Sequence, residues 1–241
     1  MAGECNQQSA LTAGVLFLIT FATSIPALWL FQPVLDDPAG YIAGASSDNR
    51  IFLGALLEAL LIVANVASGV VLFPILRRQS ETLSLGYVTA RLVESTFIAI
   101  GLVSVLAVVS LRQDPASAPS VGQGAAGAGA GAAGVALAAI KDWTFLLGPG
   151  FIVGFGNGLI LGYLMYRSGL VPRRMAVLGL VGGPLIILSG IAVLFDLFQQ
   201  GGTAQAIATI PEFLWELFLG IYLTVKGFKP SRILDPVSSR A

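Results

Sequence analysis

The chain has 241 residues, of which 56% are hydrophobic and only 11% are charged, and its mean hydropathy is +0.86. Soluble domains carry roughly 25% charged residues, so this composition predicts an integral membrane protein whose main partner is the lipid bilayer. Thirteen basic and thirteen acidic residues cancel, which argues against nucleic-acid binding, and the lack of histidine with a single cysteine, Cys5, excludes histidine–cysteine metal sites, catalytic triads and internal disulfides.

Six apolar stretches are long enough to cross a bilayer. A span needs ~20 mostly apolar residues at 1.5 Å rise to cross a hydrocarbon core of ~30 Å. The stretches that qualify are 11–31, 51–73, 83–111, 142–166, 175–198 and 207–226. We therefore predict an all-α, polytopic six-helix bundle that forms one membrane domain over residues 1–241.

The segment 112–138, between the third and fourth predicted spans, is rich in alanine and glycine. Such a composition provides few side chains that can pack and much backbone entropy to lose on ordering. It also offers almost no polar group that could hold a ligand. We expect a flexible linker on the outer side.

Basic residues divide unequally between the two sets of connections. Three connections and tails hold nine of them: Arg77, Arg78, Arg167, Arg173, Arg174, Lys226, Lys229, Arg232 and Arg240. The alternate connections hold only Arg50, Arg112 and Lys141. By the positive-inside rule, both termini are predicted to be cytoplasmic.

Ionisable residues well inside the predicted spans are the most informative feature, because a charge at the bilayer centre costs about 2.5 to 3.5 kcal/mol. They are Glu58, Arg91, Glu94 and Glu216. Counting the rise per residue from the predicted ends places all four about 10 to 18 Å below the outer surface. They are therefore expected to form one polar layer.

Spacing within the spans predicts how this layer is arranged. Arg91 and Glu94 are three residues apart on one helical face and can pair there. Glu58 shares a face with Asn65 and Gly69, a small and polar stripe that suits contact with another helix rather than with lipid.

The layer would hold three negative charges and one positive charge if every group were ionised. Desolvation and repulsion should then keep at least one carboxyl protonated near neutral pH. Three interpretations remain open: a polar network that fixes helix packing, a proton-titrating or cation-binding centre in a small carrier or sensor, and an intramembrane enzyme. The enzyme would lack a nucleophile or a metal beside its carboxylates, and no catalytic residue or cofactor is predicted.

Glu212 follows Pro211 directly. A proline in the first helical turn with an acid just after it is a common helix start, where negative charge is favoured by the dipole. If the sixth helix begins at this point, Glu212 is interfacial and Glu216, one turn deeper, is the buried acid.

Glycines recur every four residues in two of the predicted spans. Gly154, Gly158 and Gly162 share one face of the fourth span, and Gly179 and Gly183 share one face of the fifth. Small residues at this spacing let a neighbouring backbone approach closely, so they predict helix packing rather than a ligand groove lined by bare backbone.

Six segments carry a resemblance to a known family. They read "GVLFLIT", "FLGALLEALLIVANV", "LFPILRRQSETLSLGYVTARLVES", "DWTFLLG", "LMYRSGLVPRRMAVLGLVGG" and "ELFLGIYLTVKGFKPS". In this order they resemble the bacterial multi-spanning family catalogued as domain of unknown function 4386, over nearly the whole chain except the Ala/Gly-rich segment. The resemblance implies a multi-pass protein of the bacterial cytoplasmic (inner) membrane, with Glu58, Arg91, Glu94, Glu216 and the turn at 168–174 as its recurring polar positions. It implies no activity, and another membrane protein or a second copy of the chain stays open as a partner.

Overall fold

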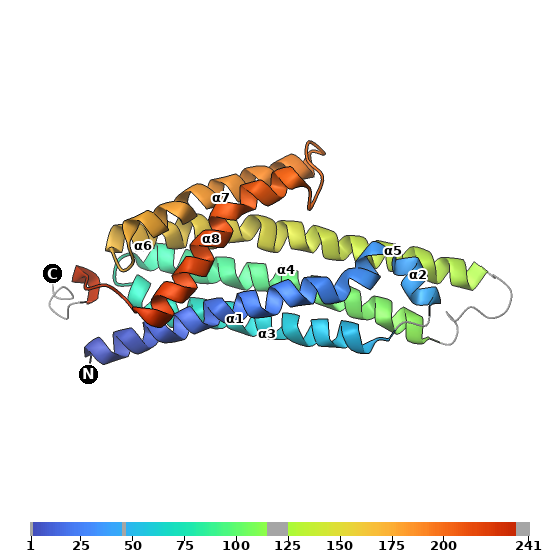
Figure 1. The fold of residues 1–241 in the computed structure, drawn as a ribbon, viewed down its shortest axis with the longest axis horizontal. Helices are drawn as coiled ribbons and strands as arrows, with labels where there is room; N and C mark the ends of the chain where they lie inside the picture. The colour runs from blue at the N-terminus through green and yellow to red at the C-terminus, as the bar shows by residue number, and fades with distance from the viewer. Residues whose placement is uncertain (1, 45–46, 115–124, 235–241) are drawn as a thin grey trace.

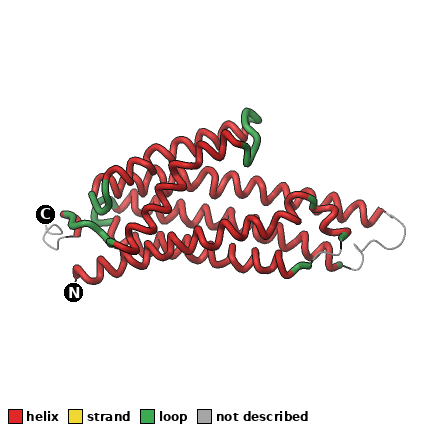
Figure 2. The backbone as a smooth tube through the Cα atoms, viewed as in Figure 1, coloured by secondary structure: helices red, strands yellow, loops and turns green. Residues whose placement is uncertain are grey.

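The computed structural model describes residues 2–44, 47–114 and 125–234, and within these ranges every regular element is a helix (Figure 2). In chain order the elements are α1 (Ala2–Asp36), α2 (Pro38–Ala43), α3 (Asn49–Leu76), α4 (Glu81–Gln113), α5 (Ala125–Leu147), η1 (Gly148–Ile152), η2 (Gly154–Leu161), α6 (Gly162–Ser168), α7 (Arg173–Leu194), α8 (Thr203–Val225) and η3 (Arg232–Leu234).

Six stretches within the described ranges are long and apolar enough to cross a membrane. They are Glu4–Asp36, Asn49–Leu76, Glu81–Gln113, Gly129–Ser168, Arg173–Leu194 and Thr203–Val225. The predicted helical class and the predicted number of spans are therefore confirmed.

The helices form an elongated bundle with both termini at one end, beside α6, and with α2 at the opposite end (Figure 1). We call these the termini end and the far end. The common position of the termini is what an even number of spans requires. That the termini end faces the cytoplasm remains a prediction.

The long helices of the bundle pack against one another in neighbouring pairs. α1 packs against α3 and α8, α4 packs against α3 and α5, and α7 packs against α8 and η2. Toward the far end the α7–α8 pair leans away from α1 (Figure 1), while its connection at residues 195–202 contacts α5, where Gln200 Nε2 donates to the Asp142 carbonyl at 2.8 Å.

Two apolar cores fill the bundle at different heights. One lies toward the termini end and includes Phe17, Leu72 and Trp215. The other lies toward the far end and includes Phe31 and Val105. The residues between these cores along α1, α3, α4 and α8 include the ionisable groups of the predicted polar layer.

Part of the predicted linker is helical. Of residues 112–138, the stretch 125–138 belongs to α5, whereas 115–124 lie outside the described residues. Alanine is the best helix former, which favours helix over linker in this segment. Its glycines also admit a close neighbour, because a Cβ atom at Gly134 would lie 2.5 Å from Ile42 Cδ1 of α2.

The fourth span is not a regular α-helix. It passes through π-helical turns in η1 and η2, where the Val153 N–H bonds the Gly148 carbonyl and the Gly162 N–H bonds the Asn157 carbonyl, each five residues back. Pro149 lacks an N–H and cannot continue an α-helical ladder. π-helical turns are rare in proteins, and those that occur are often found at functional sites. The residues that contact η1 and η2 are therefore candidates for a functional site.

Candidate functional site

A cavity of about 220 Å³ lies in the middle of the bundle, between the two apolar cores. Its walls come from α1, α3, α4, α5, η1, α7 and α8. The polar side chains that line it are Thr20, Ser24, Glu58, Asn65, Arg91, Glu94, Lys141, Thr144, Thr209, Glu212 and Glu216. All five residues of the predicted polar network, Glu58, Asn65, Arg91, Glu94 and Glu216, are therefore brought to one cavity.

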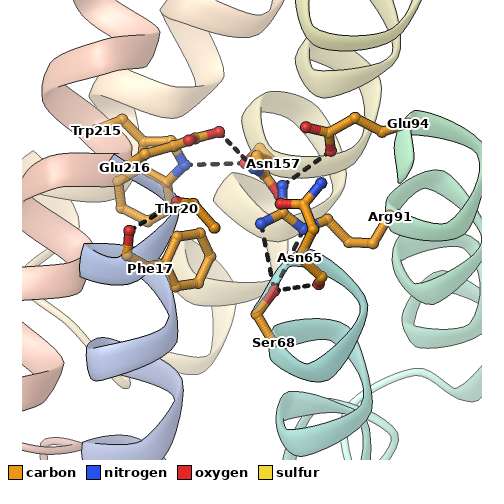
Figure 3. Close-up of polar contacts among 9 residues, drawn as sticks. All are labelled: Phe17, Thr20, Asn65, Ser68, Arg91, Glu94, Asn157, Trp215 and Glu216. Carbon is orange, nitrogen blue, oxygen red and sulfur yellow. Dashed lines mark hydrogen bonds and ion pairs between the residues drawn. The ribbon is translucent and has the colours of Figure 1, made fainter. Parts of the chain in front are cut away.

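Arg91 is almost fully buried, and all three nitrogens of its guanidinium group donate a hydrogen bond. Its Nη1 donates to Glu94 Oε2 at 2.9 Å, and its Nε and Nη2 both donate to Ser68 Oγ at 3.3 Å (Figure 3). The guanidinium carbon also lies 5.4 Å from the ring centroid of Phe17. The predicted Arg91–Glu94 pair is confirmed, and Ser68 of α3 is the partner that the sequence did not reveal.

Glu58 of α3 pairs with Lys141 of α5 rather than with Arg91. Lys141 Nζ donates to Glu58 Oε1, and both side chains are buried. The placement of Lys141 in an outer connection was therefore wrong, because the fourth span begins at Gly129 and carries Lys141 into the bundle. Gly101 of α4 leaves room for the lysine stem, since a Cβ atom there would lie 2.8 Å from Lys141 Cδ.

Glu216 of α8 contacts the π-helical segment. Asn157 Nδ2 donates to Glu216 Oε1, and Trp215 Nε1 donates to the Asn157 carbonyl at 2.9 Å (Figure 3). The same carbonyl accepts the π-type bond from Gly162. Asn157 thus ties η2 to α8 through its side chain and its backbone at once.

Glu212 lies one turn from Glu216, faces the cavity and is only 2% exposed. Neither of its carboxyl oxygens has a hydrogen-bond partner. Its Oε2 lies against bare backbone, because a Cβ atom at Gly158 or at Gly182 would be 2.8 Å from it.

The prediction that Glu212 is interfacial was wrong. α8 begins at Thr203, two turns before Pro211, so the proline lies inside the helix and not at its start. The N-terminal turn is supported instead by the Gln205 side chain, which accepts from the Gly201 N–H at 2.7 Å. Proline is tolerated inside membrane helices where neighbouring groups satisfy the backbone that it frees.

The cavity holds four acidic and two basic side chains. Arg91 pairs with Glu94, and Lys141 pairs with Glu58, so neither of these ion pairs includes a carboxyl of α8. Within the described ranges no three His, Cys, Asp or Glu side chains are grouped so that they could hold a metal ion. The arrangement therefore offers sites for protons and for cationic groups with N–H donors.

The structure adds Lys141, Glu212 and Asn157 to the site, and the sequence could have indicated the first two but not the third. A longer fourth span would have placed Lys141 in the bilayer, and a start of the sixth helix before Pro211 would have placed Glu212 there. Asn157 carries no charge and stands in the glycine-rich string "GFGNG", so depth counting passes over it.

The predicted glycine faces meet where η2 packs on α7. An added Cβ atom at Gly158 would collide with the Cα atom of Gly183, and one at Gly154 would lie 2.8 Å from the Gly183 carbonyl oxygen. Gly162 approaches Gly179, whose other neighbour is the Trp215 ring. Close packing at these five positions sets the depth at which η2 and α8 present Asn157 and Glu212.

Comparison with known proteins gives one match. The family model described as "Domain of unknown function (DUF4386)" matches residues 12–227, which include every residue that lines the cavity. No curated protein matches the chain, and no solved structure matches it.

Proposed function

We propose that this chain, which belongs to the DUF4386 family, is a proton- or cation-coupled carrier that uses the carboxyl groups of its intramembrane cavity. The six spans and the buried charges support the class of membrane protein, and the cavity supports the exchange of a small cationic species. The exchanging groups would be Glu212 and, one turn away, Glu216.

One observation carries the proposal, namely the missing partners of Glu212. A buried carboxylate without a hydrogen bond or a counter-ion is strongly unfavourable, so such a group either holds a proton or binds a cation. No hydrogen bond of another side chain is lost when Glu212 changes its protonation state, because neither of its oxygens takes part in one. The group can therefore exchange its proton for another cation.

A purely structural network explains the other polar groups better than it explains Glu212. Arg91, Glu94, Ser68 and the Lys141–Glu58 pair join helices by hydrogen bonds, as packing devices do. Intramembrane ionisable groups without such a duty usually mark a substrate or proton pathway. The cavity beside Glu212 provides the space that a packing network would not need.

We also propose a single domain in the bacterial cytoplasmic membrane, with the termini end inside. The unequal division of basic residues supports this orientation. In a variant with Cys5→Ser, a membrane-impermeant thiol reagent added outside intact cells should label a cysteine at Gln113, at the far end, and should leave a cysteine at Arg173 unlabelled. Labelling of position 173 would contradict the orientation.

Proton flux tests the proposed function. Liposomes that contain the purified protein, a pH-sensitive dye and internal Na⁺ and K⁺ should acidify when they are diluted into a more acidic buffer without these ions, because an entering proton exchanges for a leaving cation. Glu212→Gln should reduce the flux to that of protein-free liposomes, and Glu58→Gln, Glu94→Gln and Glu216→Gln should each lower it. Glu81→Gln, the same change at an exposed acid outside the cavity, is the matched control. Equal flux in the wild type and in Glu212→Gln, at equal reconstitution, contradicts the proposal.

A further inference from the structure

We propose that the cavity binds an amphipathic organic ammonium ion, with its N–H donors directed at Glu212 and its apolar body between α1 and α8, and that the ion enters sideways from the bilayer. This inference rests on the proposed function, because it names the cation that Glu212 exchanges for its proton.

The polar end of the ligand follows from atoms that lack a partner. Both oxygens of Glu212 and Oε2 of Glu58 are buried acceptors without a hydrogen bond, and both side chains line the cavity. Buried acceptors require donors, and the two basic side chains of the cavity are paired with Glu58 and Glu94 rather than with the carboxyls of α8. A primary ammonium group supplies three donors and one positive charge, whereas a quaternary ammonium supplies the charge alone.

The apolar part of the ligand follows from the remaining walls. Beside the polar groups, the cavity is lined by Phe21, Phe145, Val153, Ile186 and Phe213. A bare inorganic ion would gain nothing from these side chains and would need oxygen ligands on all sides. A cavity of about 220 Å³ holds far more than one ion or one water molecule. Aromatic rings also attract cations, which favours an ammonium group over a neutral head.

Part of the lining of the cavity is also exposed on the outer surface of the bundle. Leu28, Phe145 and Phe213 line the cavity and are also 43%, 43% and 41% exposed on the surface. Phe21 and Phe213 meet edge to face at 5.1 Å, and toward the far end α8 leans away from α1 (Figure 1). We place the entrance at these exposed lining residues of α1, α5 and α8, where the Phe21–Phe213 contact would have to part to admit a ligand from the bilayer.

Binding should release a proton. In the empty cavity the Glu212 carboxyl keeps its proton, because a lone buried carboxylate is unfavourable. When the ammonium ion binds, the carboxyl gives its proton to water and the ammonium keeps all of its own. The net charge of the cavity is then unchanged, one monovalent cation having replaced another.

Calorimetric titration of the purified protein in detergent tests this inference, with phenethylammonium as the probe. Titration at neutral pH in two buffers of different protonation enthalpy gives the affinity and the number of protons released. We expect saturable binding with about one proton released per ligand, and about hundredfold weaker binding in Glu212→Gln with no release of protons. Phenethyl alcohol, of the same shape but neutral, should not show saturable binding, and phenethyltrimethylammonium should bind more weakly because it lacks N–H donors. Glu81→Gln should behave as the wild type.

Each contrary result has a defined meaning. Equal binding of the alcohol would overturn the inference, and it needs no variant, so a Glu212→Gln protein that fails to fold does not remove the test. Equal binding of the quaternary ion would overturn the role of the N–H donors. Absence of ammonium binding beside a Glu212-dependent proton flux would overturn this inference and leave the proposed function standing. Absence of both would remove the proposed function as well.

Discussion

Two clusters of acids, cations and aromatic rings lie at different heights in this bundle and differ in how completely their groups are paired. At the far end, Asp48 accepts from Tyr41 Oη at 2.6 Å, from Gln113 Nε2 at 2.9 Å and from Arg112 Nη1, and the Arg112 guanidinium stacks over the Tyr41 ring at 4.9 Å. We call these four residues the far-end clamp. In the cavity, Glu212 has the same kind of carboxyl group, but neither of its oxygens has a hydrogen-bond partner.

The difference separates a structural role from a functional one. The far-end clamp joins α2, the start of α3 and the end of α4, and each oxygen of Asp48 receives a donor from α2 or α4. It also lies near water, which can replace a lost partner. In the cavity, Glu212 receives neither a donor from a neighbouring element nor the exposure of the far-end clamp. A carboxyl that served only for packing would be expected to have a hydrogen-bond donor.

The largest expected effect is on Arg91. Arg91→Ala leaves Glu94 buried without a cation, and we expect a loss of about 3 to 5 kcal/mol in the free energy of unfolding. Arg112→Ala removes the equivalent cation of the far-end clamp, where the side chains are 14% and 20% exposed and water can hydrate Asp48, so it should cost only about 1 kcal/mol. Unfolding of both variants in detergent, followed by circular dichroism, measures the difference.

A double variant controls for the volume that is lost at Arg91. Arg91→Met combined with Glu94→Gln removes both charges and should be less destabilised than Arg91→Ala, because no unpaired charge remains. Comparable losses for Arg91→Ala and Arg112→Ala would show that the two clusters do not differ in solvation as we propose.

Within the cavity, two isosteric changes should have unequal effects. Glu58→Gln leaves the ammonium of Lys141 without its counter-ion, and we expect a loss of about 2 to 3 kcal/mol. Glu212→Gln removes no hydrogen bond and should change the stability by less than about 1 kcal/mol, while it abolishes proton flux. The midpoint of thermal unfolding measures the first effect and the liposome assay the second. A Glu212→Gln protein that is as unstable as Glu58→Gln would assign Glu212 a packing role.

Glycine substitutions compare how tightly the two regions are packed. Gly158→Ala forces a Cβ atom against Gly183 and Glu212, so we expect a loss of about 1 to 3 kcal/mol. At Gly129, near the far end, an added Cβ atom meets nothing within 4 Å, and Gly129→Ala should stabilise α5 by up to about 1 kcal/mol. Unfolding midpoints of the two variants test this, and a stabilising Gly158→Ala would mean that the contact with α7 is loose.

Apolar length was enough to predict the middle helices closely. Residues 51–73 and 83–111 lie inside α3 and α4, because long apolar runs leave little doubt where a span must be. The ends of the fourth and sixth spans were harder, since alanine and glycine at 125–138 resemble a linker and Pro211 resembles a helix start. The helix propensity of alanine extends α5 back to Ala125, and α8 begins at Thr203 and continues through Pro211, so glycine content and proline did not mark the two boundaries.

The same two boundaries decide how much of the site could be predicted. Depth counting brings Glu58, Arg91, Glu94 and Glu216 into one layer because each of them lies well inside a predicted span. Lys141 was placed outside and Glu212 at the interface because the helices that carry them begin earlier than predicted. Which acid pairs with which cation depends on helix rotation and on close glycine contacts, neither of which a single sequence specifies.

The smallest expected effect concerns the pH dependence of the far-end clamp. Partial burial raises the pKa of Asp48, but hydrogen bonds from Tyr41 and Gln113 and the charge of Arg112 outweigh it, so this pKa lies below its ordinary value. A lowered pKa in the folded state stabilises the protein above the unfolded pKa of about 3.9, and the gain is lost as the pH falls through the folded pKa. For Tyr41 the pH dependence of stability has the opposite direction. Burial and the hydrogen bond to Asp48 raise the pKa of Tyr41 to about 12, so the stability that this tyrosine contributes is lost as the pH rises above about 10. Asp48→Asn should remove less than about 1 kcal/mol at neutral pH, and this difference should vanish once the pH falls below the folded pKa of Asp48. Asp36→Asn, the same change at an exposed acid of α1, is the control and should follow the wild type. Unfolding midpoints recorded from acid to neutral pH measure both variants, and an Asp48→Asn curve that stays parallel to the wild type would mean that the clamp does not hold this carboxylate in its charged form.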